Sequence, residues 1–259
     1  MNHVLTVALK EIVDAARDFR YLLAAFLYAI MGPLVVGLVS LAVSGTSTSG
    51  ATVLTSMMAV FTLVSAFVGG MNVAMDTVAG ERERRSLLPL LLTAVPREEI
   101  MLGKWLAVSF FALAGLLVDL LGFAIVLALT GIHSPALSLP NSVSLAFGLL
   151  SLPLLAAAMQ LLISTASHAT KEAQTYLSLV VFAPMGVGMF LIFSPAAKHA
   201  WLGYLPMVGQ QLQLEAWVNG QSIGLWQPVA LGYLTLALTF LALMVTTNRL
   251  RRDEILYGN

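Results

Sequence analysis

The sequence predicts an all-α membrane protein with six transmembrane helices, an N-terminal amphipathic interfacial helix, and a short outer-leaflet helical segment before the last span. Three observations predict this fold. Hydrophobic residues make up 59% of the chain and charged residues only 10%, whereas soluble domains average about 25% charged. Six apolar runs approach or exceed the length of about 20 residues that a spanning helix needs. The basic residues lie almost entirely on one side of those runs.

The six apolar runs belong to what we expect to be a single transmembrane domain covering residues 1–259. They lie at about residues 21–43, 53–75, 105–132, 143–167, 175–197 and 228–247. The first two carry no charged residue, and the polar stretch SGTSTSGAT separates them. The third is apolar except for Asp119. Between the fifth and sixth runs, Trp201, Tyr204, Trp217 and Trp226 predict short helices in the outer leaflet, or a simple aromatic belt at the interface.

The first twenty residues predict an amphipathic helix and not a signal peptide, because charges interrupt any apolar core. On a helix the charged side chains gather on one side and Leu5, Leu9 and Ile12 lie opposite. Such a helix lies along the membrane surface with its apolar face in the headgroup region. Packing of the same face on the protein's own spans fits the pattern equally well. The charged residues are Lys10, Glu11, Asp14, Arg17 and Asp18.

The distribution of basic residues predicts the orientation, since Lys and Arg in short loops mark the cytoplasmic side. With six spans, every Lys and Arg except Lys198 falls on one side of the membrane. An odd number of spans would destroy this separation. We therefore expect a multi-pass protein of the plasma (inner) membrane with both termini in the cytoplasm. The formal net charge of zero gives no sign of a nucleic-acid partner.

The connector between the second and third runs holds the densest charges of the chain. It reads VAGERERRSLLPLLLTAVPREEIMLGKW over residues 78–105. Pro96, followed by Glu98 and Glu99, marks a helix start, because the free N–H groups of a first turn favour negative charge. Lys104 and Trp105 lie where the third span would enter the headgroup layer. The charges suit binding to a soluble cytoplasmic partner. Taken alone, the same pattern is also typical of a solvated loop that obeys the positive-inside rule.

A longer stretch around this connector resembles the signature of the type-2 family of ABC-exporter permeases. MDTVAGERERRSLLPLLLTAVPREEIMLGKWLA, residues 75–107, has the family's Glu-Arg-Glu pattern, leucine-rich stretch, proline turn and EEIxLGK start of the third span. KEAQTYLSLVVFAP at 171–184 resembles the start of the family's fifth span, and LPMVGQQL at 205–212 its outer segment before the sixth. The most similar branch is that of the NatB-like permeases, which are named for sodium extrusion.

The resemblance implies the membrane subunit of an ABC exporter. Two permeases would form a dimer, which we expect to be a homodimer; a different second permease stays open. Each permease would bind a cytoplasmic ATP-binding subunit that holds ATP and Mg²⁺. This chain would then hold no cofactor, metal or catalytic residue and would be no enzyme by itself, in line with its lack of a GxxxxGK[ST] phosphate loop. The implied coupling contacts are Glu81, Arg82, Glu83, Arg84 and Arg85 in the segment that ends at Pro89, and Lys171 and Glu172 in the connector 167–174.

The sequence departs from the NatB-like pattern in two places. Members of that branch usually carry a large extracytoplasmic domain between their first two spans, where this chain has about nine polar residues. Pro89 also interrupts a stretch that commonly bears threonine and glutamate. The exporter class stands, while sodium, a peptide or antibiotic, and a lipid are all open as the exported substrate.

Two acidic residues are candidates for the transport pathway. Asp119 lies near the middle of the third run, where an ionised carboxylate is costly and therefore a functional hypothesis. Asp76 lies close to the inner boundary. The alternative function is an ion-gradient-driven secondary transporter that uses Asp119, and a third is a membrane scaffold without transport. We see neither an inverted repeat nor a second buried acid that would favour the secondary transporter.

Overall fold

The structure is a computed structural model that describes residues 2–43, 48–86, 89, 95–130, 139–194, 199–221 and 223–250. Every regular element within these ranges is a helix. Six helices there are long and apolar enough to cross a membrane. The predicted all-α fold with six transmembrane helices is therefore confirmed. The leucine-rich stretch after Ser86 and the C-terminal tail after Leu250 lie outside the described residues, apart from Pro89.

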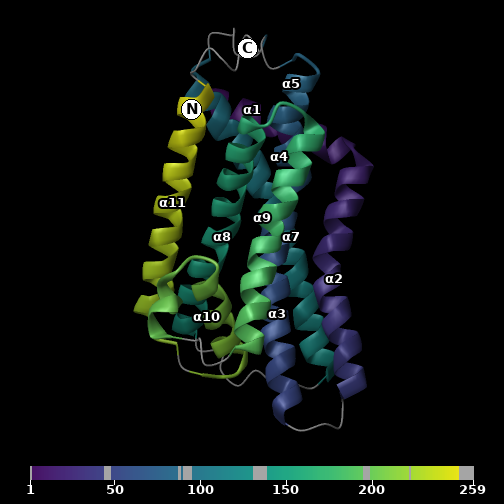
Figure 1. The fold of residues 1–259 in the computed structure, drawn as a ribbon, viewed down its shortest axis with the longest axis vertical. Helices are drawn as coiled ribbons and strands as arrows, with labels where there is room; N and C mark the ends of the chain where they lie inside the picture. The colour runs from purple at the N-terminus through teal and green to yellow at the C-terminus, as the bar shows by residue number, and fades with distance from the viewer. Residues whose placement is uncertain are drawn as a thin grey trace.

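The spanning helices run up and down along one common axis (Figure 1). They are α2 (Phe19–Val43), α3 (Thr48–Val68) with its continuation, α7 (Arg97–Thr130), α8 (Leu139–Ala166), α9 (Thr170–Phe193) and α11 (Trp226–Leu250). Helix α7 packs against α2, α3, α8 and α11, whereas α11 packs chiefly along α8. The topology follows from the alternation of apolar runs with short polar connections, which leaves consecutive spans antiparallel.

One end of the bundle gathers most of the charged side chains, and we call it the charged end. It holds α1 (Asn2–Arg17), α5 (Glu81–Glu83), the start of α7, the connection between α8 and α9, and the end of α11 (Figure 1). The Arg97 guanidinium donates to the carbonyl of Leu250 at 2.9 Å and so joins the ends of α7 and α11. The charged end is the side that the sequence predicts to be cytoplasmic, and that orientation stays a prediction.

Helix α1 packs against α7 at the charged end, where glycine allows a close approach. A Cβ added to Gly103 would lie 2.7 Å from the Cβ of Val7. The packed face of α1 includes Glu11, which the helical wheel places among the charged residues on the solvated side. That expectation is wrong for Glu11, because a buried lysine of α7, Lys104, donates a hydrogen bond to its carboxylate. Leu5 and Leu9 are exposed, so the helix offers one face to the bundle and an apolar one to its surroundings.

The second span is a broken helix. Helix α3 ends at Val68, a turn at Gly69 and Gly70 follows, and the chain continues as α4 (Met71–Met75), the π-helical turn η1 (Asp76–Gly80) and α5. A Cβ on Gly69 would lie 2.8 Å from the carbonyl oxygen of Phe111, so the break sits tightly on α7. π-helical turns are rare and are frequently found at functional sites. The sequence runs smoothly through this region and gives no sign of the π turn.

The third span begins earlier than its apolar run suggests. Helix α7 starts at Arg97, directly after Pro96, as the proline and the acids of its first turn predict. The residues between Arg97 and Trp105 are helical and mostly packed, although hydropathy alone places them in the connector. Lys104, which the pattern places in the headgroup layer, is buried inside the bundle. The reason is that carboxylates from two other helices surround it.

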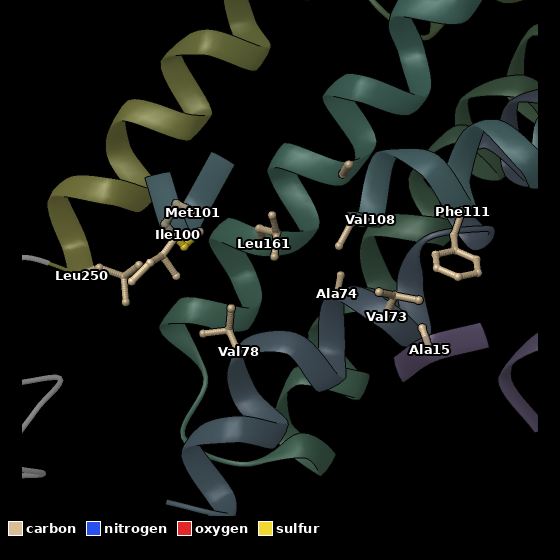
Figure 2. Close-up of a cluster of buried hydrophobic side chains, with 11 residues drawn as sticks. Ala15, Val73, Ala74, Val78, Ile100, Met101, Val108, Phe111, Leu161 and Leu250 are labelled. Carbon is tan, nitrogen blue, oxygen red and sulfur yellow. The ribbon is translucent and has the colours of Figure 1, made fainter. Parts of the chain in front are cut away.

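Beneath the charged end, a cluster of buried apolar side chains joins four of the spans and α1 (Figure 2). The second span contributes Val73, Ala74 and Val78, and α7 contributes Ile100, Met101, Val108 and Phe111. Leu161 of α8, Leu250 of α11 and Ala15 of α1 complete the labelled set (Figure 2). Close packing of this kind transmits displacement because well-packed interiors compress little.

The opposite end holds the predicted short helical segment before the last span. It consists of the 3₁₀ turn η3 (Ala200–Tyr204) and α10 (Val208–Val218). Trp201 and Trp226 are exposed, which suits an aromatic belt. Helix α10 packs against α3 and η3 and buries several polar side chains. Both readings of the tryptophan-rich segment, short helices and an aromatic belt, therefore find support in different residues.

Candidate coupling site at the charged end

Lys104 is the centre of a buried ion cluster at the charged end. Its ammonium donates to Glu81 Oε2 at 2.8 Å, to Glu11 Oε1 at 3.0 Å and to the carbonyl oxygen of Thr77 at 2.6 Å. These three acceptors match the three donors of an ammonium group. The Lys104 side chain is 1% exposed, and those of Glu11 and Glu81 are 7% and 10% exposed. The cluster joins α1, α7 and the base of the second span.

Lys10 neutralises the outer rim of this cluster. Its ammonium lies 3.1 Å from Glu11 Oε1 and 3.5 Å from Glu81 Oε1, and 55% of its side chain is exposed. Partial burial disfavours the charged form of Lys10, but Glu11, Glu81 and Asp14 outweigh it, and the pKa of Lys10 is raised above its ordinary value. Two lysines thus balance two buried glutamates. A buried charge without such a partner would be strongly destabilising.

The other side of the same segment binds the connection between α8 and α9. The Arg82 guanidinium donates to the carbonyl of Ser167 at 2.8 Å. Glu83 Oε2 accepts from the Thr170 N–H at 3.0 Å and from its hydroxyl at 2.6 Å. Thr170 is the first residue of α9, so the Glu83 carboxylate satisfies a free N–H at a helix start and faces the positive end of its dipole.

The segment closes with a turn and a further ion pair. Arg84 Nη2 lies 2.9 Å from Asp76 Oδ1 across the π turn. Arg85 has a φ of 58°, a left-handed conformation, and the N–H of Ser86 returns to the carbonyl of Glu81 at 2.9 Å. Asp76, a candidate for the transport pathway, thus binds the charged segment in this structure.

The two stretches that the resemblance implies as coupling contacts form one continuous surface. Residues 81–86 and 167–172 share the Arg82 and Glu83 hydrogen bonds described above, and the N–H of His168 donates to Glu172 Oε2 at 2.8 Å. Glu81 is buried and bonded within the chain. Arg85 and Lys171 are exposed on the surface. Binding of a partner at these residues stays a prediction.

Asp119 lies deep in the bundle, between α2 and α3. It is almost fully buried, and a Cβ placed on Gly32 of α2 would lie 3.1 Å from its Oδ1. The hydroxyl of Thr62 on α3 lies next to Asp119, yet neither carboxylate oxygen has a partner of good hydrogen-bond geometry among the described residues. A buried carboxylate left in this state is costly, so the position invites a proton, a cation or a polar ligand.

The family follows from sequence comparison. The model of the family described as ABC-2 family transporter protein matches residues 5–216. The chain belongs to the ABC-2 transporter family. ABC transporter permease protein NatB of Bacillus subtilis (strain 168) is 39% identical to it over 162 residues, which are 60% of this chain and 42% of that protein. The aligned region thus spans less than half the length of that relative. The predicted type-2 ABC permease of NatB-like character is confirmed, and such a permease subunit is not itself catalytic.

Sequence reasoning missed the residues that hold the permease's charged segment in place. Lys104, Glu11 and Thr170 were far apart in the chain, and nothing in their local patterns indicates that they meet Glu81 and Glu83. The one available signal was energetic: a lysine inside a helical stretch that continues into a span needs a carboxylate partner.

Across the described ranges of the permease, no three His, Asp or Glu side chains gather as metal ligands would.

Proposed function

We propose that this permease couples ATP hydrolysis by a separate cytoplasmic ATP-binding subunit to the export of a substrate. The subunit would dock on residues 81–86 together with residues 167–172 at the charged end. Family membership supports a membrane subunit of an ABC transporter. The observation that carries the coupling role is that one short segment is bonded to α1, to α7, to the connection after α8 and to the start of α9 at once.

A push on this segment has a direct route into the bundle. Glu81 passes it to α7 and α1 through Lys104, and Glu83 passes it to the start of α9 through Thr170. The N–H of Ala79 donates to Ser164 Oγ at 3.1 Å and so links the same region to α8. ATP binding would close the paired ATP-binding subunits, and the spans would then move from an inward-facing to an outward-facing arrangement.

The exposed part of the proposed docking surface is rich in cationic side chains. Arg84 exposes 58% of its side chain, and Arg85 and Lys171 are also exposed. Complementary charge speeds and orients association, so the facing surface of the ATP-binding subunit would carry acidic residues. The arrangement also requires the charged end to face the cytoplasm, in agreement with the positive-inside pattern.

For the assembly we propose a homodimer of permeases with two ATP-binding subunits, and for the pathway a position that includes Asp119. The burial of its carboxylate deep inside the bundle supports this role. Sodium is the first substrate to test because of the similarity to NatB, followed by a lipophilic peptide and a lipid. A gradient-driven secondary transporter using Asp119 would instead keep transporting without any ATP-binding subunit and would stop with an uncoupler.

Co-purification tests the docking role. The permease is expressed together with its ATP-binding subunit, and Arg85→Glu is combined with Lys171→Glu. We expect at least tenfold less ATP-binding subunit to be retained, which corresponds to about 1.4 kcal/mol. Arg20→Glu, at an exposed arginine of α2 outside the segment, is the matched control and should retain the subunit. Full retention by the double variant would contradict docking at this surface.

A further inference from the structure

The hydrogen bond from Lys104 to the backbone of Thr77 has a role that charge neutralisation does not explain. The ammonium lies 2.6 Å from the carbonyl oxygen of Thr77, inside the π turn η1. Thr77 Oγ1 in turn donates to the carbonyl of Ala74 at 3.3 Å. A side chain from α7 therefore holds the backbone of the second span at the place where its helical register changes.

The π turn is also fixed from the opposite side. The N–H of Ala79 donates to the hydroxyl of Ser164, a fully buried residue of α8. A π turn accommodates one more residue per turn than the α-helix around it. The two external hydrogen bonds, one to a carbonyl and one to an N–H, stabilise the turn against conversion to α-helix. The base of the second span thus has its shape imposed by α7 and α8.

Helix α1 is joined to this base through polar contacts of unequal strength. Glu11 of α1 binds the buried Lys104, which also holds Glu81 and Thr77. Lys10 of α1 reaches Glu81 directly, at 3.5 Å and with more than half of its side chain exposed. Exposed ion pairs contribute little to stability, whereas breaking a buried pair is strongly destabilising. The buried contacts of Lys104 with Glu11 and Glu81 are therefore the stronger connection between α1 and the base of the second span.

We propose that Lys104 is a positioning residue that joins the π turn to α1, so that α1 moves together with residues 81–86 when the ATP-binding subunit displaces them. The proposal rests on the proposed coupling function. Without Lys104, the stroke would still reach α9 through Glu83 and Thr170. Helix α1 would keep its apolar packing on α7 but would lose its buried polar link to the moving segment.

Distances between spin labels test this directly, because the chain has no native cysteine and labels attach only where cysteine is introduced. The first pair, Ala16→Cys with Asn248→Cys, reports α1 relative to α11. The second pair, Thr175→Cys with Asn248→Cys, reports the base of α9. All three positions are exposed. The complex with its ATP-binding subunit is measured in lipid nanodiscs without nucleotide and after trapping with ATP, Mg²⁺ and vanadate.

In the otherwise unchanged complex we expect trapping to shift both distance distributions. In Lys104→Met the α9 pair should keep its shift and the α1 pair should lose it. Glu11→Gln, which leaves Lys104 bound to Glu81 and Thr77, should give the same pattern and serves where Lys104→Met fails to assemble. Lys10→Gln is the matched control at the rim of the cluster and should leave both shifts intact.

The outcomes separate the two proposals. If the α1 pair shifts fully in Glu11→Gln or Lys104→Met while the α9 pair also shifts, Lys104 has no positioning role and the coupling function stands. If neither pair shifts in the complex with Lys104 intact, nucleotide trapping does not move the helices at the charged end. The coupling function is then contradicted together with this proposal.

Discussion

Glu81 Oε2 and Lys104 Nζ lie 2.8 Å apart at the base of the second and third spans, and both side chains are buried. The pair connects the conspicuous charged segment of the sequence to a lysine that looked like an ordinary headgroup anchor. The Glu81 carboxylate thus stabilises the inside of the bundle. The exposed side chains beside it, Arg85 and Lys171, are the ones proposed to bind a partner. This relationship decides which substitutions should affect folding and which should affect docking.

The first prediction concerns stability. Lys104→Met leaves two buried carboxylates with only Lys10 nearby, so we expect the free energy of unfolding to fall by about 3–5 kcal/mol. Lys10→Gln removes a largely exposed partner and should cost less than about 1 kcal/mol. Unfolding of both variants in mixed micelles, followed by circular dichroism, gives the comparison. Equal losses for the two variants would show that burial does not set the strength of this cluster.

The second prediction concerns the attachment of α1. Gly103→Val places a side chain where a Cβ already meets Val7 at 2.7 Å, so α1 should separate from α7 and its amide hydrogens should exchange faster. Gly186→Val is the control, since a Cβ at Gly186 meets no atom within 4 Å. Hydrogen exchange read by mass spectrometry over residues 2–17 distinguishes the variants. Unchanged protection in Gly103→Val would mean that α1 is not held by this close approach.

The third prediction concerns the start of α9. Glu83→Ala removes the acceptor of both the Thr170 N–H and its hydroxyl, so exchange of the first-turn amides of α9 should rise several-fold. The carboxylate also compensates free N–H groups at this helix start. Asp14→Ala, at an exposed acid of α1, should leave α9 unaffected. If the exchange rate of these amides in Glu83→Ala is unchanged, Glu83 does not transmit movement from the segment to α9.

The fourth prediction concerns Asp119. Asp119→Asn removes a carboxyl group that is almost fully buried, so the permease should become more stable by about 1 kcal/mol or more. ATP-driven transport in proteoliposomes should fall if the position lies on the pathway, while co-purification of the ATP-binding subunit stays unchanged. Transport at the original rate, together with the gain in stability, would assign Asp119 a purely structural place.

The spans and helix α1 could be predicted because they depend on local composition. Runs of apolar residues, the helix start at Pro96 and the one-sided distribution of Lys and Arg are all visible in short windows of sequence. The ends of the spans were less accurate where polar residues take part in the packing, as at Lys104. Hydropathy scores a lysine as surface, because it does not register carboxylates that arrive from elsewhere in the fold.

The arrangement of the candidate site was beyond sequence patterns for the same reason. Glu11, Glu81 and Lys104 lie in three separate elements, and only the folded bundle brings them within hydrogen-bonding distance. The resemblance implied two separate stretches as coupling contacts, and the structure brings residues 81–86 and 167–172 together. It did not separate the side chains that support the segment from those that remain exposed.

The most direct measurement of the central claim is site-specific photocrosslinking in the assembled transporter. A photoreactive amino acid replaces Arg85 or Lys171 at the charged end, or Trp226 at the opposite end, which is also exposed. We predict that positions 85 and 171 crosslink to the ATP-binding subunit and that position 226 does not. An intact, ATP-hydrolysing complex in which neither 85 nor 171 crosslinks to that subunit would contradict the claim that the stroke enters the bundle here.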